Sequence, residues 1–183
     1  MLRNGSSKKA VFLDRDGVIN RAPIIEGLPY SPRNIQELEI ILGVREAVTL
    51  LFSSGFEIVV VTNQPEVARG FLYIDDIEKI HEEISNQTGL KHFKVCFHDN
   101  EDRCDCRKPK PGMLSQAAKE FNLDLKQSFL VGDRWKDIQA GQEVGCRCFF
   151  IDYGYCEMKP KPPFDRVTSL LEAARVITEN QDA

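Results

Sequence analysis

Short apolar runs alternate with longer amphipathic stretches along this chain. Five of the apolar runs have the length of a strand and predict buried β-strands, at residues 10–14, 56–61, 92–97, 128–131 and 146–151. The amphipathic stretches predict helices over 44–54, over 75–87 with Asp75 as N-cap, from Pro111 onward, over 137–144 and over 168–178. Strands that alternate with helices pair in parallel through right-handed crossovers, so the pattern predicts a sheet with helices on both faces.

The predicted architecture is therefore a three-layer, doubly wound α/β fold around a mostly parallel, five-stranded sheet. A chain of 183 residues fits one such domain with a full core, and we place this domain at residues 9–183. The polar segment 1–8 before it is expected to be a disordered tail. Ligands of such sheets bind at the carboxyl ends of the strands, so the residues that follow each strand are the first candidates for a functional site.

Acidic residues follow two of the predicted strands. Asp14 and Asp16 stand two residues apart at the end of the first strand, and Asp133 follows the fourth. Three carboxylates at one sheet edge would repel each other unless a cation lay between them. Oxygen ligands favour a hard divalent ion, so the pattern predicts a Mg²⁺ site. The alternative is a polar strand end whose carboxylates only cap the backbone.

Composition and charge are those of an ordinary globular protein. Hydrophobic residues make up 42% of the chain and charged residues 28%, and the net charge is −4. The acidic balance argues against nucleic acid or an anionic membrane as a general partner. No apolar stretch is long enough to cross a bilayer, and the polar N-terminus lacks the apolar segment of a secretory signal. We therefore expect a cytoplasmic protein whose cysteines are reduced.

Four metal-binding side chains gather in a short segment after the third predicted strand. They are Cys96, His98, Cys104 and Cys106. Three thiolates and one imidazole suit tetrahedral Zn²⁺. The alternative is a chance cluster of small buried hydrophobic side chains, but the polar residues 99–103 argue against burial. A site closed by four protein ligands is structural rather than catalytic, and it would stiffen the loop that carries the next residues of the chain.

Four short motifs lie at strand ends or at a helix start: FLDRDGVIN at 12–20, TNQ at 62–64, RKPKPGM at 107–113 and GDR at 132–134. In this order they resemble the four motifs of the haloacid dehalogenase superfamily of phosphotransferases. The resemblance covers residues 10–152 and implies the Rossmann-like fold of that superfamily.

The resemblance also implies a reaction. Asp14 would attack the phosphorus atom and form an aspartyl phosphate, while Asp16 would protonate the leaving oxygen and later take a proton from water. Thr62 and Lys108 would bind oxygens of the phosphoryl group. Asp14, the backbone carbonyl of Asp16, and Asp133 would hold the Mg²⁺ ion.

Further roles follow from the same motifs. The substrate would be bound by Asn63, Gln64, Arg107 and Arg134. Asp137 is expected to partner Lys108 or the waters of the metal. Lys110 competes with Lys108 for the third motif, but the superfamily pattern favours Lys108. The second motif could instead be an ordinary turn, and His81, in mid-helix among charges, is expected to be solvated.

The cysteine segment followed by Arg-Lys-Pro resembles one branch of the superfamily. That branch holds the D-glycero-D-manno-heptose 1,7-bisphosphate phosphatases and the histidinol-phosphate phosphatases. Residues 68–70 and 137–141 resemble the heptose enzymes. The five-residue gap between His98 and Cys104 is nearer the histidinol type, and Pro65-Glu66 stands where heptose enzymes usually have Ser-Gly.

The spacing of the motifs leaves no room for a cap domain. Only about 45 residues separate the first motif from the second, and the second from the third, whereas domains begin near 50 residues. The site should therefore be open and suit a small phosphorylated metabolite. We expect a Mg²⁺-dependent phosphomonoesterase for a sugar bisphosphate, as a monomer or weak homodimer. The alternatives are a phosphatase for histidinol phosphate or another small molecule, and a zinc-stabilised binding module without activity.

Overall fold

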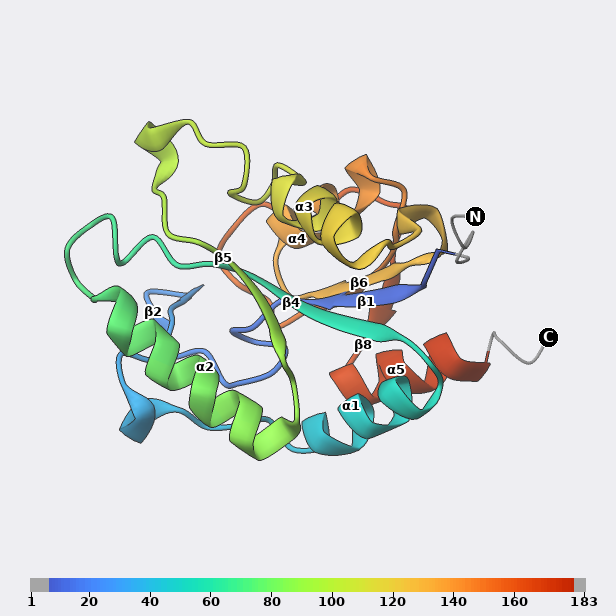
Figure 1. The fold of residues 1–183 in the computed structure, drawn as a ribbon. Coiled ribbons are helices and arrows are strands. Elements are labelled where there is room, and N and C mark those ends of the chain that lie inside the picture. The colour runs from blue at the N-terminus through green and yellow to red at the C-terminus, as the bar shows by residue number, and fades with distance from the viewer. Residues whose placement is uncertain (1–6, 180–183) are drawn as a thin grey trace, which may run out of the picture.

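A six-stranded parallel sheet forms the centre of the computed structural model, which describes residues 7–179 (Figure 1). In spatial order the strands are β5 (His92–Cys96), β4 (Glu57–Asn63), β1 (Ala10–Leu13), β6 (Phe129–Gly132), β7 (Arg147–Ile151) and β8 (Asp165–Val167). All pairings within this sheet are parallel. The predicted doubly wound, parallel architecture is confirmed, and its switch point lies between β1 and β6.

Helices cover both faces of the sheet (Figure 1). One face carries α1 (Val44–Ser53), α2 (Ile74–Thr88) and α5 (Leu170–Glu179), and the other carries α3 (Gly112–Phe121) and α4 (Trp135–Glu143). Alternate side chains of β1 therefore enter two different cores. Val11 and Leu13 pack under the first group of helices, and Ala10 and Phe12 under the second.

The sheet has one strand more than the five predicted. β8 pairs with the end of β7, in a stretch where the sequence pattern predicts only a proline-rich loop. The strand has three residues, of which Asp165 and Arg166 are polar, so no apolar run marks it.

Two helices begin earlier than predicted, for the same reason. The Tyr73 N–H donates to Asp76 Oδ2 at 3.2 Å before α2, and the Arg134 N–H donates to Asp137 Oδ2 at 2.9 Å before α4. In each case the carboxylate in the third helical position reaches back to cap the first turn. Asp75 is therefore not the N-cap of α2.

Lys8, the last residue of the predicted tail at residues 1–8, is hydrogen-bonded to the rest of the domain. Residues 1–6 lie outside the described part of the chain. The Lys8 N–H donates to the Asn122 carbonyl at 2.9 Å, and the Lys8 carbonyl accepts from the Asp124 N–H at 2.8 Å. The ordered chain thus includes Lys8, which these two bonds tie to the turn after α3.

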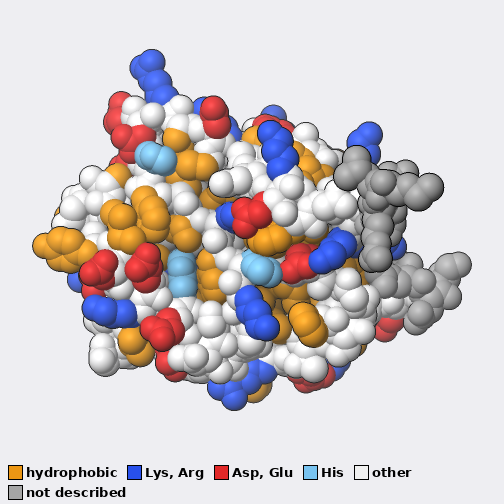
Figure 2. Space-filling model, in the orientation of Figure 1, with side chains coloured by type: hydrophobic (Ala, Val, Ile, Leu, Met, Phe, Trp, Pro, Cys, Tyr) orange, Lys and Arg blue, Asp and Glu red, His pale blue; other side chains and the backbone are white. Residues whose placement is uncertain are grey.

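Short elements form most of the remaining chain. Between β1 and β4 lie an antiparallel hairpin of β2 (Ile24–Ile25) and β3 (Leu28–Pro29), and the 3₁₀ turn η1 (Ile35–Glu37). Two further 3₁₀ turns are η2 (Asn100–Asp102) and η3 (Leu125–Gln127). No helix of the described residues has the length and hydropathy to cross a bilayer. On the face drawn in Figure 2, acidic and basic side chains are interspersed rather than separated.

Candidate active site

Three carboxylates meet where β1 and β6 end. Leu13 pairs with Val131 in the sheet, so Asp14 and Asp133 follow side by side at the switch point. Asp137 joins them from the first turn of α4. One oxygen of each of the three carboxylates lies within 4.8 Å of the others. The expected juxtaposition of Asp14 and Asp133 is therefore present, but the third carboxylate is that of Asp137 and not, as the sequence pattern suggests, that of Asp16.

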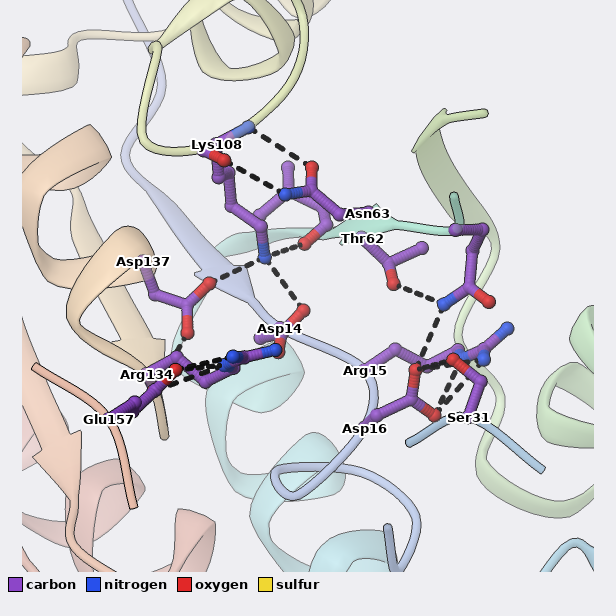
Figure 3. Close-up of polar contacts among 12 residues, drawn as sticks. Asp14, Arg15, Asp16, Ser31, Thr62, Asn63, Lys108, Arg134, Asp137 and Glu157 are labelled. Atoms are coloured by element: carbon purple, nitrogen blue, oxygen red, sulfur yellow. Dashed lines mark hydrogen bonds and ion pairs between the residues drawn. The ribbon is translucent and has the colours of Figure 1, made fainter. Parts of the chain in front are cut away.

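Lys108 reaches into this cluster from the loop before α3 (Figure 3). Its Nζ lies 2.7 Å from Asp14 Oδ1 and 2.6 Å from Asp137 Oδ1, and donates to the Val61 carbonyl at 2.6 Å. Only 2% of Lys108 is exposed, so its charge is confined to the site. Asp137 partners Lys108, as the sequence predicts.

Asp133 is held on one oxygen only. The Tyr155 hydroxyl donates to its Oδ2 at 2.7 Å, while its buried Oδ1 has no hydrogen-bond partner. Gly17 makes room for this carboxylate: a Cβ at Gly17 would lie 1.9 Å from Asp133 Oδ2, and the Gly17 φ of +88° also favours glycine. The glycine of the first motif is thus needed for close packing as well as for the turn.

The buried cluster has three carboxylates and only one ammonium group, that of Lys108. Burial, and then the charge of Asp137, raise the pKa of Asp14 to about 6. Burial and the charge of Asp14 raise the pKa of Asp133 well above its ordinary value. Burial lowers the pKa of Lys108, but Asp137 and Asp14 outweigh it, and the pKa is raised. A divalent cation beside the unpaired oxygen of Asp133 would relieve this repulsion, so the donor set fits Mg²⁺.

Asp16 lies in the opposite environment, surrounded by hydrogen-bond donors. Its Oδ1 accepts from Arg15 Nε at 3.1 Å and Asn20 Nδ2 at 2.9 Å. Its Oδ2 accepts from Arg15 Nη2 at 2.9 Å, Ser31 Oγ at 2.8 Å and Gln64 Nε2 at 2.9 Å. Burial raises the pKa of Asp16, but the Arg15 guanidinium and these hydrogen bonds outweigh it, so the pKa falls below its ordinary value.

The three residues of the second motif, Thr62, Asn63 and Gln64, make different contacts in the site. Thr62 lines the cavity at the end of β4. Asn63 pairs with the backbone of Lys108, donating to its carbonyl and accepting from its N–H, both at 3.0 Å. Gln64 is fully buried and bridges Thr62 Oγ1, at 2.8 Å, to Asp16. Asn63 therefore positions the loop of Lys108, and Gln64 lies behind the cavity wall rather than at its surface.

A cavity of about 330 Å³ opens over these groups. It is lined by Asp14, Asp16 and Asp137, by the β3 segment, and by five cationic side chains: Arg69, Arg107, Lys108, Arg134 and Lys136. Arg107 is fixed by two bonds, to Asn100 Oδ1 and to the His98 carbonyl, each at 3.0 Å. Arg134 is paired with Glu157. Both arginines thus lie where the sequence predicts substrate contacts.

The cysteine segment closes on itself beside the cavity. Cys96 Sγ lies 3.7 Å from Cys104 Sγ and 3.2 Å from Cys106 Sγ, and His98 Nδ1 lies 3.3 Å from Cys106 Sγ. In a tetrahedral zinc site with bonds of about 2.3 Å the sulfur atoms lie about 3.7 Å apart. Here the three sulfur pairs lie 3.2 to 3.7 Å apart, close enough for one ion to bind all of them after small shifts. Lys110 belongs to this segment, because its Nζ donates to the Cys104 carbonyl at 2.7 Å. Lys108, and not Lys110, enters the catalytic cluster.

His81 is buried, and the expectation that it is solvated is wrong. Its Nε2 lies 3.1 Å from Arg15 Nη1, and its ring stacks on Phe93 with centroids 4.5 Å apart. The face of α2 that carries His81 packs toward β5, which the local charge pattern does not reveal. Other site residues that sequence reasoning missed are Tyr155, Glu157, Ser31 and Lys136, and only Lys136 lies beside a recognised motif.

Comparison with known proteins agrees with this geometry. Residues 105–173 match the family model for HAD-hydrolase-like proteins. A D-glycero-β-D-manno-heptose-1,7-bisphosphate 7-phosphatase from Pasteurella multocida is 40% identical over 146 residues, which cover 74% of this chain and 76% of that protein. The chain belongs to the haloacid dehalogenase-like phosphatases. The predicted class, a phosphoric monoester hydrolase, is confirmed at the level of this family.

Two further relatives extend the comparison. A D-glycero-α-D-manno-heptose-1,7-bisphosphate 7-phosphatase from Photorhabdus laumondii is 34% identical over 170 residues, which cover 83% of this chain and 87% of that protein. Among solved structures, the D,D-heptose 1,7-bisphosphate phosphatase of B. bronchiseptica, in complex with magnesium and phosphate, matches with a TM-score of 0.81 and 27% identity over 96% of this chain and 99% of that one. The Pasteurella multocida relative is named for the β anomer of the sugar and the Photorhabdus laumondii relative for the α anomer.

Proposed function

We propose that this protein is a Mg²⁺-dependent phosphatase that removes the 7-phosphate of D-glycero-D-manno-heptose 1,7-bisphosphate through an aspartyl-phosphate intermediate. The proposal depends above all on one observation: Asp14, Asp133 and Asp137 surround Lys108 at the floor of a cavity with a cationic rim. The names of the relatives support the choice of substrate.

Asp14 and Asp16 divide the chemistry between them. An Asp14 oxygen attacks phosphorus, the bond from phosphorus to the sugar oxygen breaks, and the sugar oxygen keeps the electron pair and takes a proton from Asp16. The free site lowers the pKa of Asp16, so the negative charge of the bound phosphate must raise that pKa for Asp16 to carry this proton. Water then attacks the phosphorus of the acyl phosphate, and Asp16 takes its proton. The Asp14 carboxylate and inorganic phosphate are the products. Thr62 and Lys108 bind the phosphoryl oxygens during both steps.

Asp14, Asp133 and the backbone carbonyl of Asp16 would hold the Mg²⁺ ion. When bound, the ion offsets the negative charge that gathers as a phosphate approaches the carboxylates. Asp137 Oδ1 lies 2.6 Å from Lys108 Nζ. Its negative charge keeps Lys108 protonated and holds the Lys108 ammonium group toward the phosphoryl site.

A bisphosphate needs a second anion site, and Arg107 and Lys136 are suited to it. Both line the cavity. Burial, and then the charges of Arg134 and Arg107, lower the pKa of Lys136, so an anion beside it would be stabilising. Arg134 and Arg69 are less available, because Glu157 and Asp99 already pair with them. Asn63 and Gln64, also expected to bind substrate, would act through the groups they position.

The cysteine segment would hold one structural Zn²⁺ through Cys96, His98, Cys104 and Cys106. The position of this site in the chain would couple it to the cavity, because Arg107 directly follows Cys106 and donates to the His98 carbonyl. A closed metal site there would keep the Arg107 guanidinium at the cavity rim.

The setting of the reaction is part of the proposal. The enzyme would act on a small metabolite in the cytoplasm, where cysteines stay reduced, as a monomer or weak homodimer. Residues 9–183 would act as a single domain.

A second candidate substrate is histidinol phosphate, and Glu66 favours it. The Glu66 carboxylate lines the cavity, where it adds a negative charge that suits a substrate with an ammonium group. Its nearest cation, Arg69, lies 4.0 Å away and is already bound by Asp99.

A panel of phosphate monoesters assayed with Mg²⁺ tests these proposals. It should include both anomers of the heptose bisphosphate and histidinol phosphate. We expect kcat/KM for one heptose anomer to exceed that for histidinol phosphate by about 100-fold or more. The reverse order would transfer the assignment to histidinol phosphate, and no turnover of any ester would contradict the phosphatase assignment itself.

A further inference from the structure

Arg15 is the largest fully buried side chain of the protein, although it stands between the two aspartates of the first motif. Its guanidinium uses Nε and Nη2 on the Asp16 carboxylate, at 3.1 and 2.9 Å. The third nitrogen, Nη1, points away from Asp16 and lies 3.1 Å from His81 Nε2. Arg15 thus links Asp16 to a side chain that is 66 residues further along the chain (Figure 3 shows the Asp16 end).

His81 is built to accept this bond. A guanidinium has only donors, so His81 Nε2 must be the acceptor and Nδ1 must carry the proton. Burial, and then the Arg15 charge, lower the pKa of His81 to about 3, so the ring stays neutral. The ring is kept in place by its stack on Phe93, with an interplanar angle of 19°. His81 does not line the cavity, so it has no route to the substrate itself.

Loss of the His81 nitrogen would leave Arg15 with a buried, unpaired donor. Unpaired buried donors are unfavourable, so the guanidinium would shift toward another acceptor. Such a shift would disturb the planar, two-bond grip on Asp16, which depends on orientation. Ser31 and Gln64 would still donate to Asp16 Oδ2, but neither bonds both carboxylate oxygens as Arg15 does.

We propose that His81 is a positioning residue for the phosphatase reaction: it orients the Arg15 guanidinium, which in turn orients the Asp16 carboxyl toward the leaving oxygen. This inference rests on the proposed role of Asp16 as general acid. It makes α2 part of the catalytic apparatus although α2 contributes no side chain to the cavity lining.

Leaving groups of different acidity separate this role from simple structural support. A sugar oxygen needs the Asp16 proton when its bond to phosphorus breaks, whereas p-nitrophenolate is stable without one. In His81→Phe, which keeps an aromatic ring against Phe93 but has no acceptor, we expect kcat for the sugar phosphate to fall about 10- to 100-fold. The kcat/KM for p-nitrophenyl phosphate, which reports the formation of the aspartyl phosphate and not the later attack of water, should change by less than about threefold, as should the KM for the sugar phosphate.

Two matched variants complete the experiment. His81→Gln restores a neutral acceptor and should recover kcat to within about threefold of wild type. His92→Phe is the matched control, because it makes the same substitution on β5, where the His92 ring contacts Glu57 and Phe121. This variant should leave the hydrolysis of both substrates unchanged. Should His81→Phe fail to fold, Phe93→Leu frees the imidazole while keeping every polar group, and the same selective loss of sugar-phosphate turnover is expected.

The outcomes distinguish this inference from the proposed function. Wild-type protein that hydrolyses neither substrate would overturn the phosphatase assignment. Active wild type with unchanged kcat for the sugar phosphate in His81→Phe, an equal loss of kcat/KM for both leaving groups, or a loss confined to KM would overturn the role of His81 alone. Failure of His81→Gln to recover turnover would also count against it.

Discussion

The catalytic edge of the sheet and the cysteine segment both gather metal-binding side chains, but different parts of the structure hold them. Asp14 and Asp133 follow two paired strands that are completely buried or nearly so, and Lys108 supplies a neutralising charge. In the cysteine segment, only Cys96 ends a strand. His98, Cys104 and Cys106 lie on a loop whose other residues are mostly exposed.

This difference predicts different consequences of metal loss. The packed sheet preforms the catalytic edge, so its carboxylates should keep their places without Mg²⁺ and lose only function. The cysteine segment has little apolar packing of its own, so its shape should depend on zinc. Disturbing each region in turn tests this contrast.

The largest effect should come from Asp14→Asn. Removal of the nucleophile should lower phosphatase turnover by about 10⁴-fold or more, because the neighbouring carboxylates have other roles in the proposed mechanism and none replaces the attacking oxygen. The melting temperature should stay nearly unchanged, since Lys108 keeps Asp137 and one buried carboxylate charge is removed. Phosphate release and a thermal melt measure the two effects. Turnover at the wild-type level would contradict the nucleophile assignment.

Substitutions in the cysteine segment should lower the stability of the protein rather than its catalytic turnover. Cys106→Ser removes the sulfur that lies within 3.4 Å of both other thiols. We expect zinc to disappear from elemental analysis and the free energy of unfolding to fall by a few kcal/mol, a part of the ~10 kcal/mol typical of structural zinc sites. Cys156→Ser, on an exposed thiol outside the cluster, is the matched control. Equal zinc content in the two variants would argue against a zinc site.

A smaller effect should follow from loosening one metal ligand. Tyr155→Phe removes the hydroxyl that donates to Asp133 Oδ2 at 2.7 Å and allows that carboxylate to rotate. Mg²⁺ affinity, measured by calorimetry, should weaken about tenfold. Tyr153→Phe, on the neighbouring ring, should leave it unchanged. If Tyr155→Phe binds Mg²⁺ as tightly as wild type, Asp133 is held by the sheet edge alone.

The smallest effect concerns the pH dependence of stability on the Asp16 side of the site. The pKa of His81 is about 3 in the folded protein and about 6.5 when unfolded, so the unfolded state binds the extra proton below pH 6.5. Stability is therefore full above that pH and falls as the pH drops. Between pH 8 and pH 6 the loss due to His81 should be about 0.8 kcal/mol. Urea unfolding of wild type and His81→Gln at both pH values should show that difference; parallel curves would contradict it.

Most of the fold could be predicted because its signals are local. Buried strands such as β4 are continuous apolar runs, and glycines such as Gly89 mark helix ends. The sequence pattern does not reveal β8, because a strand of three residues with two polar side chains shows no apolar periodicity. The starts of α2 and α4 were misplaced because a carboxylate can cap a helix from its third position as well as from its first.

The catalytic motifs could also be predicted, since they are short and stand at strand ends. The sequence could not tell that Asn63 would hold the Lys108 backbone or that Gln64 would lie behind the cavity. Those contacts join residues that are 45 and 48 positions apart. Nothing in the local pattern around Tyr155 connects it to Asp133.

The sequence by itself determined the order of most elements, the edge at which the motifs meet and the donor types at both candidate metal sites. Only the tertiary structure decided what surrounds each carboxylate. Asp14 and Asp16 are two residues apart, yet the pKa of one is raised and that of the other lowered. The reason is physical: electrostatic and hydrogen-bonding environments depend on distance in space, and packing brings Asp137 to Asp14 but turns Asp16 toward Arg15.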